Sequence, residues 1–265
     1  MPNGWQLIVG VLGIVTVISY VVYAISAISF FTRPFIGVMV THTMVVNAGQ
    51  PTGAFTESEW DGKAQGLLRN DQIIEINGTP LFETADRTDF ATARQNFNEL
   101  VTGTDTIEVT VFRKNIEEGV SECNAGTNIC TFNVTPAPRF PAVDLLAYFV
   151  APYVAGILII GLGLYIARHK FDAPEGVMAV AIAFSSALFT GGLFDIGTQA
   201  VFAPGWIIGG CGVAASLTVF GINFPKRIRE VRKMFFVDYA VLGILALIAA
   251  YFIFSFYNPE DAWTQ

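Results

Sequence analysis

Residues 66–80, GLLRNDQIIEINGTP, decide the fold of the water-facing part of this chain. They read as a tight turn, then a short strand in which Ile74 and Ile76 alternate with Gln72 and Glu75, then a turn at Asn77-Gly78. Asn-Gly between apolar residues is the strongest short-range signal for a two-residue β-hairpin. A soluble-domain hairpin therefore lies within a chain whose other long segments are apolar.

The composition indicates a membrane protein. Hydrophobic residues make up 53% of the 265 residues, charged residues only 14%, and Phe occurs 23 times. Soluble domains are less apolar and more charged than this. Most of the net charge of -7 lies in residues 32–142, which hold eight Lys and Arg against fourteen Asp and Glu. Basic residues do not cluster on this part of the chain, so no nucleic-acid partner is expected.

Residues 1–31 are predicted to form the first transmembrane helix. The uncharged apolar run 5–31 is longer than the roughly 20 residues that cross a bilayer. A cleaved signal peptide is the alternative, but the run lacks a basic start and a clear small-residue cleavage site. A retained anchor is therefore favoured. Polar residues recur at spacings of three and four along this helix, which predicts a face packed on neighbouring helices. They are Thr16, Ser19, Tyr23 and Ser26.

Residues 143–257 contain four further apolar runs, each long enough to span a bilayer. The runs cover residues 143–167, 176–197, 204–224 and 235–257. Lys and Arg concentrate in the loops after the second and fourth helices, whereas the loop after the third helix and the tail 258–265 contain neither. Because basic loops stay in the cytoplasm, the N-terminus is expected inside, and residues 32–142 and the C-terminal tail outside. We expect the membrane to be a bacterial plasma membrane with which the helices make lipid contact.

Residues 32–142 have the turns and charges of a water-facing domain with one small core. Residues 35–46 are rich in β-branched residues and are predicted to be strand-like, as are residues 106–113. Residues 85–101 have helical spacing of apolar side chains, with Thr84 or Asp86 as the helix cap. The expected fold class is an α-helical membrane bundle of five helices with an extracytoplasmic α+β domain.

The order of these elements, together with the Ile76-Asn77-Gly78 turn, resembles the PDZ family over residues 35–114. In that family a peptide adds to a strand beside a helix by β-augmentation. The resemblance implies a loop at Ile36-Gly37-Val38 whose N–H groups would cradle a peptide carboxylate. The sequence lacks the complete Gly-Leu-Gly-Phe loop of the family, so a closed or repurposed groove is an equal alternative. The implied peptide-binding residues are Ile36, Gly37, Val38, Val40 and His42 on the strand side and Phe90, Ala93 and Phe97 on the helix side.

Cys123 and Cys130 flank a Gly- and Asn-rich turn, which predicts a hairpin disulfide in an oxidising compartment. Two unpaired, reduced cysteines are the alternative. A zinc site would need four ligands, and none lie nearby in the sequence. The disulfide prediction and the basic-loop rule agree in placing this domain outside the cytoplasm.

Catalytic motifs are not found. The two histidines, His42 and His169, form no His-Glu-x-x-His, and no serine-nucleophile motif, phosphate-binding glycine loop or haem motif occurs. We therefore expect no enzyme activity, no metal and no cofactor. Asp195 near the outer end of the third helix is a candidate intramembrane functional residue, with a position at the water boundary as the alternative. Gly205 and Gly209 form a small-x-x-x-small pattern that suits close helix packing, within the chain or in a homo-oligomer.

The layout of one helix, an outer PDZ-like domain and a helix bundle resembles the N-terminal sensor region of ComP-type bacterial receptor histidine kinases. This resemblance implies a non-catalytic receptor-like or scaffolding protein that binds a peptide or protein segment outside and couples it to the bundle. The chain is then expected to be either a fragment of a longer receptor or a complete protein that works by association. The alternative function is an accessory subunit of a larger membrane complex, with the PDZ-like domain as a cap.

Overall fold

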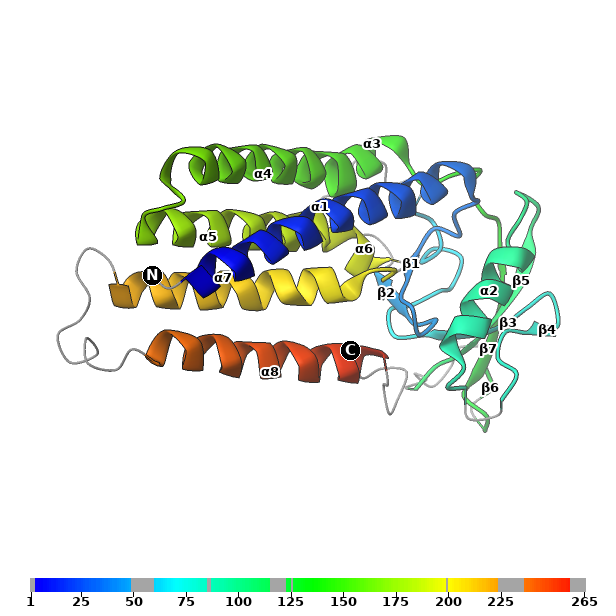
Figure 1. The fold of residues 1–265 in the computed structure, drawn as a ribbon. Coiled ribbons are helices and arrows are strands. Elements are labelled where there is room, and N and C mark those ends of the chain that lie inside the picture. The colour runs from blue at the N-terminus through cyan, green and yellow to red at the C-terminus, as the bar shows by residue number, and fades with distance from the viewer. Residues whose placement is uncertain are drawn as a thin grey trace. The chain divides into compact units, whose positions relative to one another are not determined.

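The computed structural model describes residues 3–48, 60–84, 87–114, 123–124, 126–198, 200–223 and 236–257. The chain divides into two compact units, which we describe separately (Figure 1). The membrane unit comprises Met1–Ile25, Tyr148–Asp195 and Val201–Asn258. The sheet unit comprises Ser26–Ala147, Ile196–Ala200 and Pro259–Gln265.

Among the described residues, five helical segments are long and apolar enough to cross a membrane, which confirms the number predicted from the sequence and suits an integral membrane protein. The first is α1 (Asn3–Thr32), and the second joins α3 (Ala142–Leu145), a π-helical turn (Leu146–Val150) and α4 (Ala151–Lys170). The third joins α5 (Pro174–Gly191) and α6 (Leu193–Gly197), and the last two are α7 (Ala203–Asn223) and α8 (Val237–Tyr257).

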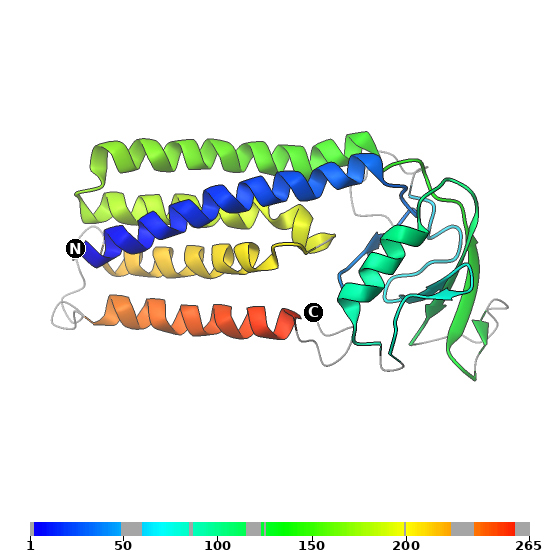
Figure 2. The same cartoon turned by 45° about the vertical axis from the view of Figure 1, so that its right-hand side comes forward.

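Helix α5 is the centre of the membrane unit and packs between α4 and α7, as both views show (Figures 1 and 2). Two thirds of its apolar span is buried, against 6% of that of α8. Small residues such as Ala181, Ser185 and Ala187 let neighbouring helices approach α5 closely. Helix α8 packs against α7 and carries large exposed apolar side chains such as Leu247 and Phe254, which suits lipid contact.

The predicted polar face of α1 is buried by packing. Thr16, Ser19 and Tyr23 are almost fully inaccessible. The Tyr20 hydroxyl donates to the carbonyl of Ala187 at 2.9 Å, and the Tyr153 hydroxyl donates to the carbonyl of Tyr20 at 3.1 Å. This face therefore joins α1 to α4 and α5, as the helix-packing interpretation predicted.

The sheet unit contains a five-stranded antiparallel sheet with strand order β4-β3-β5-β7-β6. Its strands are β3 (Gln72–Ile76), β4 (Thr79–Pro80), β5 (Ile107–Phe112), β6 (Cys123–Asn124) and β7 (Ile129–Val134). A separate two-stranded ribbon pairs β1 (Met39–Val40) with β2 (Val46–Ala48), and helix α2 spans Phe90–Leu100.

The Asn-Gly hairpin is confirmed. Asn77 and Gly78 both have positive φ, at 49° and 76°, as a type I′ turn between β3 and β4 requires. The predicted alternation is wrong in one detail, because the register of β3 shifts between Ile73 and Glu75. Ile73 and Ile76 are fully buried, and Ile74 is only partly buried against the core. Gln72, predicted on the polar side of the strand, is also buried, at 2% exposed.

Two further expectations needed correction. Residues 35–46 are not one strand, because Gly37 and Met44 have positive φ and a turn at residues 41–44 separates β1 from β2. Helix α2 begins at Phe90 rather than near residue 85, and the expected cap Asp86 lies outside the described residues. The carboxylate of Asp89 accepts hydrogen bonds from Glu83 N at 2.8 Å and from the Thr84 hydroxyl at 3.1 Å, so it holds the loop before the helix.

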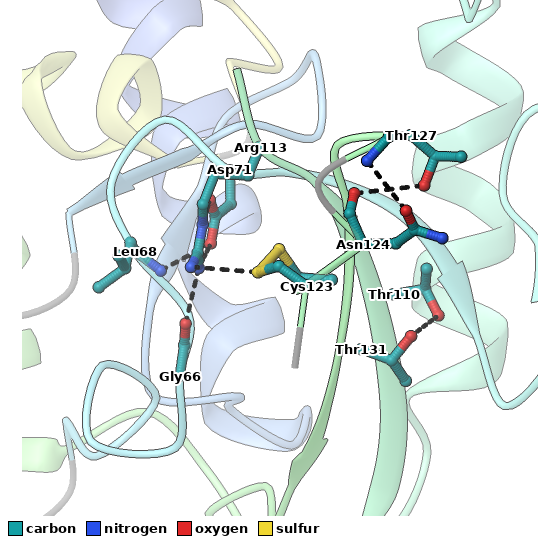
Figure 3. Close-up of a disulfide and its surroundings, with 11 residues drawn as sticks. Gly66, Leu68, Asp71, Thr110, Arg113, Cys123, Asn124, Thr127 and Thr131 are labelled. Carbon is teal, nitrogen blue, oxygen red and sulfur yellow. Dashed lines mark hydrogen bonds and ion pairs between the residues drawn. A yellow bond between two sulfur atoms is a disulfide. The ribbon is translucent and has the colours of Figure 1, made fainter. Parts of the chain in front are cut away.

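The predicted disulfide between Cys123 and Cys130 is present and joins directly paired residues of β6 and β7 (Figure 3). Beside it lies a buried ion pair. Arg113 donates to the two carboxylate oxygens of Asp71 at 2.7 and 2.6 Å and to the carbonyl of Gly66 at 2.8 Å. Asp71 also accepts from Leu68 N at 2.8 Å. The turn before β3 is therefore fixed to the end of β5.

The two ends of the sheet unit are joined to each other. Phe35, just after α1, and Ala137, just before α3, exchange backbone hydrogen bonds at 2.8 and 2.7 Å. Trp60 stacks edge-on against Phe35 and Phe140, and its indole N–H donates to the buried carboxylate of Asp144 at 2.9 Å. The entry and exit segments of the sheet unit are therefore joined by backbone pairing and by a cluster of aromatic rings.

Candidate functional site

The sheet unit has a cavity of about 90 Å³ between the β1 segment and helix α2. Helix α2 is held beside the hairpin, because the Asn96 side chain donates to the carbonyl of Leu81 at 2.8 Å. The cavity wall is mostly apolar, with two arginines. It is formed by Arg33, Pro34, Phe35, Ile36, Val38, Met39, Val40, Met44, Arg94, Phe97, Asn98, Phe140 and Thr198.

Four of the eight predicted peptide-binding residues line this cavity. Ile36 and Val38 are almost fully buried and form its floor with the core, whereas Val40 and Phe97 are half-buried. Apolar side chains before and within β1 therefore share this cavity with one from helix α2.

The other four predicted residues lie elsewhere. Gly37 has φ of 75° and packs against the backbone of Gly62. His42 lies in the turn after β1, Ala93 is fully buried in the core, and Phe90 packs against Phe82. These four serve the fold around the cavity and do not form its wall.

Arg94 is the polar feature of the cavity that the sequence did not single out. Its guanidinium donates to the backbone carbonyl of Thr198 at 2.9 Å, across 104 positions of the chain. Thr198 follows α6, and its segment Ile196–Ala200 belongs to the sheet unit. Arg33 adds a second positive charge to the lining and is itself exposed. Two guanidinium groups beside an apolar wall suit a carboxylate attached to an apolar group.

The carboxylate of Asp195 in the membrane unit is held by two backbone hydrogen bonds. Its side chain is 2% exposed, and its two oxygens accept hydrogen bonds from Val201 N at 3.1 Å and Phe202 N at 2.8 Å. These N–H groups lie just before α7, where a helix leaves donors without intrahelical partners. The carboxylate therefore stabilises the start of α7.

The glycines expected to allow close packing do so within the chain. A side chain at Gly205 would clash with the Tyr23 hydroxyl, and one at Gly209 would meet Leu188 and the backbone N of Phe189. Both glycines are buried between α7 and its neighbours α1 and α5. Across the described residues, no group of three or more His, Cys, Asp or Glu side chains could hold a metal ion.

Comparisons of the chain with protein-family models, with curated proteins and with solved structures find no match.

Proposed function

We propose that this chain is a non-catalytic, receptor-like or scaffolding membrane protein whose PDZ-like sheet unit binds a peptide or protein segment. The observation that carries the proposal is the cavity between the β1 segment and α2, with Arg94 in its wall. Its volume of about 90 Å³ has room for one apolar side chain of a bound segment. Main-chain pairing along β1 would supply affinity, and the cavity would supply specificity.

The charges favour a segment that carries a carboxylate next to the apolar side chain. Arg94 now donates to a neutral backbone carbonyl of Thr198. A carboxylate would form a stronger, charge-assisted bond with the same guanidinium. A ligand would therefore compete with Thr198 for Arg94 and release the segment Ile196–Ala200. In this proposal that release, together with the backbone pairing of Phe35 and Ala137, couples binding to the helices.

Peptide binding is expected to depend on the free carboxylate of the peptide and on Val40 at the β1 side of the cavity. Fluorescent peptides that end in an apolar residue with a free carboxylate should bind the full chain in nanodiscs, and their C-terminal amides should bind at least about tenfold more weakly. Val40→Glu should weaken binding by a similar factor, since it places a carboxylate beside the bound one. Gln95→Ala, on the exposed side of α2, is the matched control and should bind as the parent does. Equal binding by acid, amide and Val40→Glu would refute the groove.

We propose that the sheet unit lies outside the cytoplasm of a bacterial cell, an orientation that the basic loops and the disulfide support. On intact cells, a membrane-impermeant reductant followed by an impermeant maleimide should label two cysteines per chain. The label should map to Cys123 and Cys130 and vanish in the Cys123→Ser/Cys130→Ser variant. Cys211, within α7, should stay unlabelled until detergent is added. Labelling that requires permeabilised cells would reverse the orientation.

The absence of catalysis is part of the proposal. The carboxylate of Asp195, the candidate with the strongest claim to chemistry, already accepts two backbone N–H groups. A hydrolytic activity of the purified chain that disappears in Asp195→Asn, with the fold intact, would contradict this part.

An accessory subunit of a larger membrane complex is the second candidate, favoured by the Thr198 carbonyl that already engages Arg94 at the cavity. In that case the sheet unit is a structural cap. Purification from native membranes separates the two functions, because a subunit would co-migrate with fixed stoichiometric partners and a receptor would not.

A further inference from the structure

The charges of residues 32–142 are segregated along the sequence. All fourteen Asp and Glu of this part lie between Glu57 and Glu122. The stretch 29–45, which begins in the last turn of α1, and the stretch 134–143, which ends in the first turn of α3, contain no Asp or Glu. The only Lys or Arg residues of these two stretches are Arg33 and Arg139, and both are exposed. The segments that adjoin the membrane helices are therefore positive in an otherwise acidic domain.

The ends of the same helices adjoin the wall of the cavity beside β1. Arg33 lies one residue after α1, Phe140 two residues before α3, and Thr198 one residue after α6. A chain extends at most about 3.6 Å per residue, so these three residues lie within roughly 7 Å of the helix ends. Each of the three helices belongs to a segment long and apolar enough to span a membrane. The headgroup layer on each side of a bilayer is roughly 5–8 Å thick. This wall of the cavity therefore lies beside the lipid headgroups.

Phosphate is the anion that the headgroup layer offers to the arginines of the cavity. Arg33 is exposed and forms no ion pair with a described residue. Arg94 donates from one guanidinium nitrogen to the carbonyl of Thr198. A guanidinium has five N–H donors, so this bond leaves room for a second acceptor. Guanidinium groups bind phosphate through parallel, charge-assisted hydrogen bonds. Both arginines line one cavity, so a single phosphate can engage the two.

We propose that Arg33 and Arg94 bind the phosphate of an anionic phospholipid at this cavity while no peptide occupies it. Arg139, three residues before α3, adds a third positive charge near the same level. An anionic lipid fits better than a zwitterionic one, because a choline group would bring its own positive charge close to the arginines. A peptide carboxylate has to displace this phosphate, so the lipid lowers the affinity for peptide. This competition rests on the proposed function, whereas the lipid binding does not.

Lipid binding is tested by titrating the full chain in detergent with phosphatidylglycerol or with phosphatidylcholine of the same acyl chains, read by native mass spectrometry. We expect phosphatidylglycerol to bind at least about tenfold more tightly. Arg33→Gln and Arg94→Gln should each weaken its binding about tenfold, as the loss of one charge-assisted contact does. Arg69→Gln is the matched control, because Arg69 is exposed and lies outside the lining. This control should bind the lipid as the parent does, and thermal unfolding shows that each variant is folded.

The lipid site would be overturned by equal binding of the two lipids or by phosphatidylglycerol binding that Arg33→Gln leaves unchanged. Displacement of the lipid by millimolar inorganic phosphate would also overturn it, since the site would then take free phosphate.

Peptide binding in nanodiscs tests the competition. A peptide with an apolar C-terminal residue and a free carboxylate should bind at least about threefold more weakly in nanodiscs that contain phosphatidylglycerol than in phosphatidylcholine alone. This lipid dependence should shrink in Arg33→Gln. A dependence that persists there in full would reflect repulsion by the anionic surface and would overturn the competition. Failure of the peptide to bind in either lipid would refute the proposed function instead, and the lipid titration would still decide the lipid site.

Discussion

Replacing Asp71 by Asn is expected to lower the free energy of unfolding of the sheet unit by about 3–5 kcal/mol. The side chain of Asp71 is 1% exposed and that of Arg113 is 9% exposed. Asn keeps the shape but removes the charge, which leaves the Arg113 guanidinium buried without its counter-ion. Removing one partner of a buried pair costs far more than the pair itself contributes.

Native-state hydrogen exchange of the β3 and β5 amides, measured on the full chain, gives this free energy directly. Asp105→Asn is the matched control, because Asp105 is exposed in the loop just before β5. This variant should change the free energy of unfolding obtained from the exchange rates by less than about 0.5 kcal/mol. A loss below about 1 kcal/mol in Asp71→Asn would mean that the pair is solvated and contributes as a surface pair does.

Replacing Gly37 by Ala is expected to have the second large effect, lowering the free energy of unfolding of the sheet unit by about 3 kcal/mol or more. A residue with a side chain costs roughly 1 kcal/mol at positive φ, and Gly37 has φ of 75°. The added methyl group would also clash with the backbone N of Gly62 and approach Asp61 Oδ1 to 2.9 Å. Backbone cannot move aside as a flexible side chain can, so β1 and the floor of the cavity would shift.

Gly78→Ala separates the two parts of this effect. Gly78 has nearly the same φ, 76°, but no atom lies within 4 Å of the position its methyl group would take. The Gly78→Ala variant should therefore lower the free energy of unfolding only by the roughly 1 kcal/mol that the backbone strain costs. The same hydrogen-exchange measurement compares the two variants. If Gly37→Ala lowered the free energy of unfolding no more than Gly78→Ala does, the close approach of Gly37 and Gly62 would contribute nothing to the requirement for glycine at position 37.

Local patterns predicted the local elements of this fold. Asn77-Gly78 predicted the hairpin, and the spacing of apolar residues predicted α2 and the five long helices. The strand β7 was missed, although Cys130, Phe132 and Val134 alternate with polar residues and are all buried. This period of two is the pattern of a half-buried strand and could have predicted β7.

Long-range contacts could not be predicted from one sequence. Nothing near Arg94 indicates that its partner is the carbonyl of Thr198, because a backbone carbonyl has no residue signature. The pairing of Asp71 with Arg113 likewise depends on the register of β3 and β5. The strand pattern around Val40 and the helix pattern around Phe97 predicted that these two residues face one site. The two arginines that line the cavity, Arg33 and Arg94, were found only in the structure.

The most direct test of the proposed function is the hydrogen-exchange footprint of a bound peptide on the full chain in nanodiscs. The probe is the tightest-binding peptide with an apolar C-terminal residue and a free carboxylate. We predict slower exchange at β1, Met39–Val40, and along the cavity side of α2 from Arg94 to Asn98, with no change in the hairpin of β6 and β7. Protection that spares β1 and α2, or that appears only at another surface of the sheet unit, would contradict the account.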